Sequence, residues 1–220
     1  MAILATDLFT LGANFLEQSS ESMDKKDRST ALDEKGDVAC ESMTNNSDEF
    51  SNEFKYCGSD IKTDLGSFLT TFGAPSNSKL ITGIDISFQA GQQPTVSVRG
   101  LQYPTAITSI QNADVSAAVP SSSGGVTVPT LTGVTLGAAA SPISLNISFS
   151  LNHIPAIGAD GEVFTAENTT FTAEADAEYL GVPTTYDTVT SWTTDSYGES
   201  DSNSDHDRAK WTGHQYFDAT

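Results

Sequence analysis

Residues Ile143–Asn152 alternate without a break between large apolar and small polar side chains. The odd positions hold Ile, Leu, Ile, Phe and Leu, and every even position holds Ser or Asn. A period of two places all the apolar side chains on one face of an extended strand, whereas a helix would scatter them around its circumference. The sequence therefore predicts a half-buried β-strand in the middle of the chain.

Other stretches carry the same signal. Residues 80–88 and 95–100 flank the turn residues Ala90–Pro94, which predicts a β-hairpin. A long strand is expected from about Glu162 to Leu180. Many short strands between loops rich in Gly, Ser and Pro predict a mainly β fold, an antiparallel sandwich or barrel. Further strands are expected at 105–111, 114–119, 125–128 and 130–136.

Helix signals are confined to the first third of the chain. Apolar residues recur at helical spacing between Leu4 and Phe15, which predicts a short amphipathic helix. Such a helix is marginal alone in water, so it is expected to dock on the body or on another subunit. A second short helix is predicted at Asp60–Leu69 and is ended by Gly73–Pro75.

Composition divides the chain into three parts. Residues 1–53 form the N-terminal helix and a polar arm of mixed charge, which is expected to order on assembly. Residues 54–180 form the β body. Residues 181–220 form a polar, acidic extension with scattered aromatic residues, expected to wrap over the body or a neighbour.

The charge of the chain excludes two classes of partner. At 220 residues the net charge is −19, which repels nucleic acid and anionic membrane surfaces. Lys79 and Arg99 are the two basic residues between Thr63 and Asp207. No apolar run reaches the ~18 residues that span a bilayer, and Met1–Ala5 lacks the basic flank of a signal peptide. Synthesis in a cytoplasm without general secretion is expected.

Cys40 and Cys57 are the two cysteines. In a reducing compartment they are expected to be thiols, with a single disulfide as the alternative.

The strongest metal candidate is Asp201–Asp207, whose oxygen-bearing side chains alternate as at the start of an EF-hand loop. His206 stands where that loop needs Gly, and Thr212 stands where it needs Glu. The stretch is therefore interpreted as a solvated acidic tail. A looser calcium site that adds Asp195 and Glu199 stays open as the alternative.

The remaining chemistry-bearing residues form no recognised motif. His153, His206 and His214 lack the short spacing of zinc ligands, and His153 is expected at the surface of a strand end. The chain has no Gly-x-Ser-x-Gly, P-loop or dinucleotide-binding signature. No catalytic, cofactor-binding or metal-binding residue is predicted, and the protein is expected not to be an enzyme.

One acidic row and three short matches need separate interpretation. The carboxylates at alternate positions of 174–178 face one side of a strand, where they favour solubility and protect a sheet edge. Asn-x-Ser/Thr matches are interpreted as chance, because no export signal accompanies them. The row is Glu174, Asp176 and Glu178, and the matches lie at Asn45, Asn146 and Asn168.

The hairpin at Ile81–Gly100 resembles hairpins in virion proteins of the tail and neck of tailed bacteriophages. The resemblance extends loosely over the β body and covers neither terminus. It implies a non-enzymatic structural virion protein of the tail tube, neck or baseplate. Such a protein is made in the host cytoplasm and assembles into a ring or tube with itself and other virion proteins.

Two other classes remain as alternatives. One is a β-sandwich module that binds carbohydrate or a cell surface, with Trp192, Tyr197 and Trp211 as stacking platforms. The other is a hydrolase whose site comes together only in three dimensions.

Overall fold

A computed structural model describes most of the chain, including every strand and helix named below. The described residues are 11–17, 22–24, 28–32, 34–36, 38–43, 47–76, 78–103, 106–107, 110–122, 125–138, 140–157, 163–185, 189–202 and 205–220.

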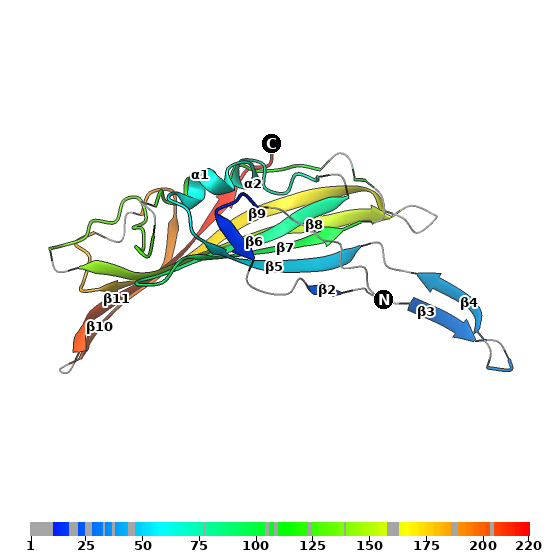
Figure 1. Cartoon of the computed structure of the whole chain (residues 1–220), viewed down its shortest axis with the longest axis horizontal. Coiled ribbons are helices and arrows are strands. Elements are labelled where there is room, and N and C mark those ends of the chain that lie inside the picture. The colour runs from blue at the N-terminus through cyan, green and yellow to red at the C-terminus, as the bar shows by residue number, and fades with distance from the viewer. Residues whose placement is uncertain are drawn as a thin grey trace.

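The protein is built on one open antiparallel sheet (Figure 1). Its strands follow the order β1-β5-β7-β6-β8-β9-β11-β10, and β2 pairs with β5 beside β1. The predicted mainly β, antiparallel fold is confirmed. The strands are β1 Phe15–Glu17, β2 Ser22–Asp24, β5 Asp48–Tyr56, β6 Lys79–Gln89, β7 Thr95–Gln102, β8 Ser141–Ile157, β9 Val163–Leu180, β10 Thr193–Ser202 and β11 Asp205–Phe217.

Three hairpins lie side by side in this sheet: β6–β7, β8–β9 and β10–β11. The alternating stretch Ile143–Asn152 lies within β8, as predicted. Leu145, Ile147 and Phe149 are buried, while the polar residues between them face the other side. The predicted hairpin at 80–100 is β6–β7, and the predicted long strand is β9.

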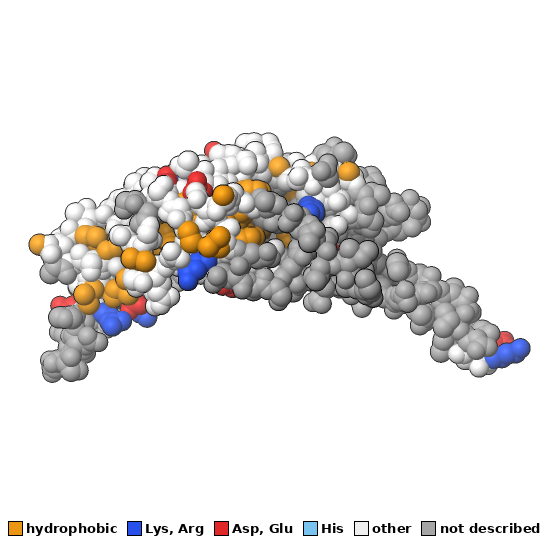
Figure 2. Space-filling view, in the orientation of Figure 1, with side chains coloured by type: hydrophobic (Ala, Val, Ile, Leu, Met, Phe, Trp, Pro, Cys, Tyr) orange, Lys and Arg blue, Asp and Glu red, His pale blue; other side chains and the backbone are white. Residues whose placement is uncertain are grey.

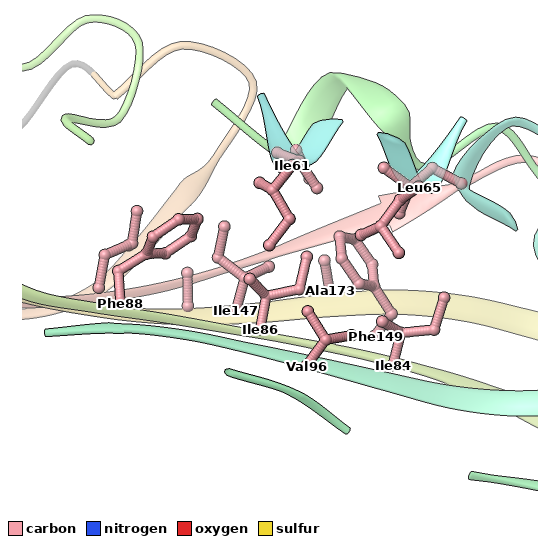
Figure 3. Close-up of a cluster of buried hydrophobic side chains, with 14 of the residues drawn as sticks. Ile61, Leu65, Ile84, Ile86, Phe88, Val96, Ile147, Phe149 and Ala173 are labelled. Atoms are coloured by element: carbon pink, nitrogen blue, oxygen red, sulfur yellow. The ribbon is translucent and has the colours of Figure 1, made fainter. Parts of the chain in front are cut away.

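Short helices and irregular chain cover one face of the sheet, called here the inner face. Helix α1 (Ile61–Leu65), helix α2 (Ser67–Thr70) and the 3-10 turn η1 (Ser116–Ala118) lie in this layer. Figure 3 shows Ile61 and Leu65 of α1 pointing into the side chains of the sheet, among them Phe149. Full burial of one such side chain stabilises the fold by about 1.5–3 kcal/mol. None of the described helices is long enough and apolar enough to cross a membrane.

The covering layer differs from the four strands expected between 105 and 136. Its described residues form η1 and irregular chain, with isolated bridges from Phe72 to Ala113 and from Thr135 to Thr185. Its apolar side chains pack onto the inner face, but the backbone of its described residues pairs with none of the strands of the sheet. The sheet is therefore covered by loops and short helices rather than by a second sheet. The residues buried from this layer include Val115, Val119, Val128 and Leu131.

The two termini also differ from expectation. Phe15, expected in a helix, begins strand β1, while residues 1–10 of that predicted helix lie outside the described residues. The predicted arm contains β1, β2 and a separate two-stranded ribbon, β3 (Arg28–Leu32) with β4 (Val38–Met43). The C-terminal segment provides β10 and β11, and β11 pairs with β9 along ten positions. This segment is part of the sheet, not a wrapping extension.

Candidate functional site

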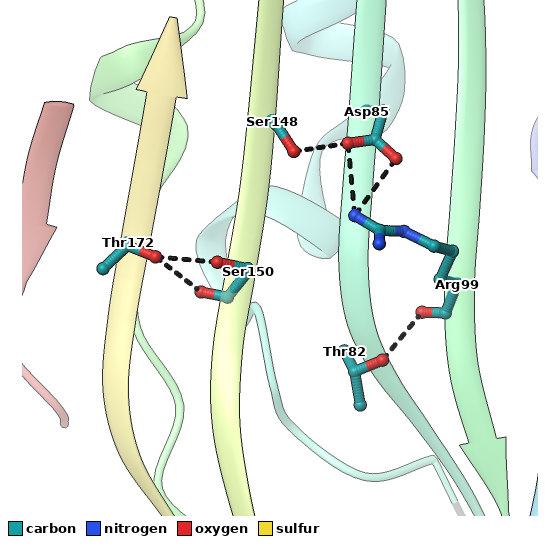
Figure 4. A network of polar contacts seen from close by, with 6 residues as sticks. All are labelled: Thr82, Asp85, Arg99, Ser148, Ser150 and Thr172. Atoms are coloured by element: carbon teal, nitrogen blue, oxygen red, sulfur yellow. Dashed lines mark hydrogen bonds and ion pairs between the residues drawn. The ribbon is translucent and has the colours of Figure 1, made fainter. Parts of the chain in front are cut away.

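The face of the sheet opposite the helices, called here the outer face, carries a polar network (Figure 4). Arg99 on β7 lies 3.2 Å from the Asp85 carboxylate on β6, and Ser148 on β8 donates a hydrogen bond to the same carboxylate. Ser150 and Thr172 share a 2.7 Å hydrogen bond between β8 and β9. These pairs cross neighbouring strands because the two-residue period brings even positions of β8 and β9 to this face.

The predicted acidic row lies on the outer face, where Glu174 and Asp176 are exposed. Asn146 donates a 2.9 Å hydrogen bond to Asp176, and Arg208 contacts Glu178 at 3.1 Å. A groove of about 380 Å³ runs beside the row. Most of the residues that line it are polar, whereas pockets that bind small molecules are lined mainly by hydrophobic and aromatic side chains. The lining comprises Asn146, Ser148, Glu174, Ala175, Asp176, Asp195, Thr212 and Gly213.

A second polar cluster lies partly buried where the sheet meets the covering layer. His153 in β8 contacts the Tyr103 hydroxyl through Nε2 and Asn168 Oδ1 through Nδ1, the latter at 2.9 Å. Asn168 Nδ2 donates to the carbonyls of Gly73, at 3.1 Å, and Gln111, at 2.7 Å. The side chains of Tyr103, His153 and Asn168 are called the clasp below.

Burial governs the electrostatics of the clasp. It lowers the pKa of His153 because an imidazolium is poorly solvated there, and the hydrogen bond with Asn168 opposes this in part. Burial also raises the pKa of Tyr103 to about 12. The neutral forms of both side chains are therefore favoured at neutral pH.

Tyr103, His153 and Asn168 are linked in the same order as the nucleophile, the base and the orienting group of a catalytic triad. The clasp therefore has to be tested as a candidate catalytic site. Tyr103 is 3% exposed and packs with Leu80, Ile107 and Val163. A nucleophilic phenol needs access to substrate and a lowered pKa, and Tyr103 has neither. The clasp is a structural cross-link between the sheet and its covering layer.

The structure corrects the prediction for His153. It describes the side chain of His214 but not that of His206. His153 is partly buried within β8 and does not lie at the surface of a strand end. His214 lies on β11, where its Nδ1 is 2.7 Å from Asp195 Oδ1. The side chain of His206 lies outside the described residues.

The calcium candidate Asp201–Asp207 spans the turn of the β10–β11 hairpin and is flanked by strands. An EF-hand loop lies between two helices, so the backbone here has a different form. Side chains 201–206 lie outside the described residues. Elsewhere in the described chain, no group of three or more His, Cys, Asp or Glu side chains is placed to hold a metal ion.

Of the two cysteines, the structure describes the side chain of Cys57 alone. Cys57 is an exposed free thiol, and its Sγ lies 3.5 Å from Gln93 Oε1. The side chain of Cys40 lies outside the described residues.

Of the three proposed stacking platforms, Trp211 lies in the core, and Trp192 and Tyr197 are partly buried against it. Trp211 is 1% exposed, and its ring meets Trp192 edge to face at a centroid distance of 5.9 Å. Trp211 Nε1 donates to Thr194 Oγ1 at 3.0 Å, and Tyr197 packs against the same core cluster. These residues offer no row of exposed rings to a sugar, which counts against this form of the binding-module hypothesis.

Charged side chains are spread thinly on the visible face of the molecule. Figure 2 shows mostly white and orange atoms on the described body, with a few groups of red and blue atoms, some of them next to one another. No protein-family model matches the chain, and no curated protein matches it.

Sequence reasoning missed two members of the clasp. Tyr103 lies between the predicted elements, and Asn168 belongs to an Asn-x-Thr match that is interpreted as chance. Asn168 is 2% exposed in this fold. Its one available signal is that it is a polar residue within the long predicted strand, three positions before the alternation that begins at Phe171.

Proposed function

We propose that this chain is a non-enzymatic structural protein that assembles with copies of itself and with other proteins of a tailed-phage virion, in the tail tube, neck or baseplate. The observation that carries the proposal is the β3–β4 ribbon, which extends away from the body in Figure 1. A two-stranded ribbon alone is marginally stable in water. A contact with a neighbouring subunit would supply the packing that two strands lack.

The place of the ribbon in the chain supports this role. It is inserted between β2 and β5, which pair with each other at one edge of the sheet. The ribbon and the β10–β11 hairpin lie at opposite ends of the molecule, and both bend away from α1 and α2 (Figure 1). A subunit with projections at both ends is suited to contact two neighbours in a ring.

The outer face suits the lumen of such a ring. Its exposed carboxylates, Glu174 and Asp176, would repel DNA phosphates and keep a passing genome from adhering. An assembly in which this face is buried between subunits, or lies on the outside of the ring, would contradict the lumen assignment.

Light scattering of the full chain over a range of concentrations tests self-assembly. We expect a defined ring, or a mass that grows with concentration as tubes form. The matched variant replaces Arg28–Met43, whose ends are paired in the ribbon, with a short Gly-Ser linker. It should stay monomeric with an unchanged thermal unfolding midpoint.

The control variant is Ser150→Ala, a change at an exposed position of β8 that leaves both projections intact, and it should assemble as the full chain does. A full chain that is monomeric at every concentration would contradict self-assembly. Normal assembly of the linker variant would contradict the role of the ribbon.

A further inference from the structure

We propose that the clasp is an acid-sensitive latch: protonation of His153 releases the segments that carry Tyr103 and Gln111 from the sheet. This inference is independent of the proposed function, because it concerns how the covering layer is held to the sheet within one chain.

The clasp joins parts of the chain that are distant in sequence. His153 comes from β8 and Asn168 from β9, so both belong to the sheet. Tyr103 follows β7, and the backbone N–H of Asn168 also donates to Gln111 Oε1 at 3.4 Å. The Gly73 carbonyl, just after α2, completes the set. Opening the clasp therefore frees the covering layer at several points at once.

The hydrogen bonds of the clasp fix the direction of each donor. Asn168 Nδ2 faces two carbonyl oxygens, so it is the amide nitrogen and Asn168 Oδ1 is an acceptor. His153 Nδ1 must then carry the proton that it donates to Oδ1. In the neutral ring Nε2 is left as an acceptor, and the Tyr103 hydroxyl donates to it.

Protonation of His153 breaks this pattern. Nε2 gains a proton, so the Tyr103 oxygen can then only accept from it, and the hydroxyl hydrogen must rotate toward the apolar side chains of Leu80, Ile107 and Val163. The new charge is also poorly solvated in this position. Both effects favour a state in which the clasp is open and the imidazolium reaches water.

The groups around His153 offer its charged form little support. Tyr103 is the titratable side chain in contact with it, and burial keeps that phenol neutral. Glu167, next to Asn168 on β9, is exposed and pairs in register with Ile154. Lys79, at the start of β6, pairs in register with Gln102. Burial lowers the pKa of His153, the hydrogen bond with Asn168 opposes this in part, and no carboxylate of the described residues acts on it.

Hydrogen exchange of the full chain at pH 7.5 and pH 5.5, corrected for intrinsic exchange rates, tests the latch. We expect amides between Tyr103 and Asn112 to lose up to about tenfold of their protection at pH 5.5, the limit set by a histidine that titrates normally once released. In His153→Gln, which cannot titrate but can accept a hydrogen bond from Tyr103, protection should not change between the two values. His214→Gln, at the surface pair with Asp195, should behave like the unaltered chain.

A second variant keeps the test decisive if His153→Gln does not fold. Tyr103→Phe removes the O–H donor that favours neutral His153, so the imidazole should titrate at a higher pH by NMR than in the unaltered chain. The proposal is overturned if protection at 103–112 is the same at both pH values in the unaltered chain. It is equally overturned if His153→Gln keeps the loss of protection, or if Tyr103→Phe leaves the titration of His153 unchanged.

Discussion

The Tyr56 hydroxyl donates a 2.6 Å hydrogen bond to Asp64 Oδ2 and so ties strand β5 to helix α1. Asn14 Nδ2 reaches the same oxygen at 2.8 Å. Burial, reinforced by the bond to Asp64, raises the pKa of Tyr56 far above its ordinary value of 10.0. Tyr56 therefore remains a hydrogen-bond donor throughout the pH range in which the protein would be handled.

Replacing Tyr56 with Phe should lower the free energy of unfolding by about 1.5–3 kcal/mol, because a hydrogen bond to a charged acceptor is lost. Urea denaturation followed by circular dichroism measures the change. The control is Tyr216→Phe, since Tyr216 is 68% exposed and its loss should fall within about 0.5 kcal/mol. Equal effects of the two substitutions would show that the Tyr56–Asp64 bond does not stabilise the fold.

Gly73 should not tolerate a side chain. Its φ is +88°, and a Cβ would lie 2.9 Å from both Asn168 Nδ2 and Phe171 Cε1. Gly73→Ala should destabilise the protein by about 1–3 kcal/mol through crowding, in addition to backbone strain. Gly91→Ala is the matched control, because Gly91 has a φ of +78° but open space around its Cα. Thermal unfolding should therefore show a larger loss for Gly73→Ala, and a smaller or equal loss would contradict the crowding.

Neighbouring residues of β8 should differ sharply in their effect on stability. Phe149 is fully buried on the inner face, and Phe149→Ala should cost about 3–5 kcal/mol through lost packing and the cavity left behind. Ser150 is exposed on the outer face, and Ser150→Ala should change stability by about 0.5 kcal/mol or less. Similar losses in urea denaturation would mean that the two faces of β8 are wrongly assigned.

The dependence of stability on pH should show two separate windows. The pKa of His153 is lowered from 6.5, so its contribution is complete above pH 6.5 and is lost as the pH falls through the lower folded-state value. Two hydrogen bonds with Ser116 lower the pKa of Asp114 from 3.8, so stability from this carboxylate is present above pH 3.8 and is lost below it.

Unfolding in urea at a series of pH values separates these windows. His153→Gln should flatten the curve below pH 6.5 and leave the decline at more acid pH. Asp114→Asn should weaken the decline below pH 4 and leave the upper window. A variant that alters the opposite window would contradict the assignment.

The alternation of β8 was sufficient to predict the strand and its buried face, because each apolar position is filled by a large side chain. Strand β11 has the same alternation in the structure, but Gly213 occupies one of its inner positions. A Cβ there would lie 2.4 Å from Trp211 Cζ2, so the indole lies close over the position that a side chain would fill. A search for alternating apolar residues reads this glycine as a gap, and the strand was missed.

The covering layer was misread for a different reason. Val115, Val119, Val128 and Leu131 are apolar and β-branched or aliphatic, which indicates burial as well as strand propensity. Burial was correctly indicated, but strand pairing depends on a partner backbone that local sequence does not specify. The clasp could not be predicted at all, because β8 must fold back on β9 before His153 meets Asn168, fifteen residues away.

The place of β11 in the sheet has a consequence for synthesis of the chain. Strand β8 is made before β9 and can pair with it at once, but the other edge of β9 stays unpaired until Asp205–Phe217, which follow β9 in the chain, have been made. Until then the nascent chain presents a long strand with a free edge and no Trp211 to cover its small inner side chains. We therefore expect that two chains of this protein pair through the free edge of β9 most readily during translation, on polysomes.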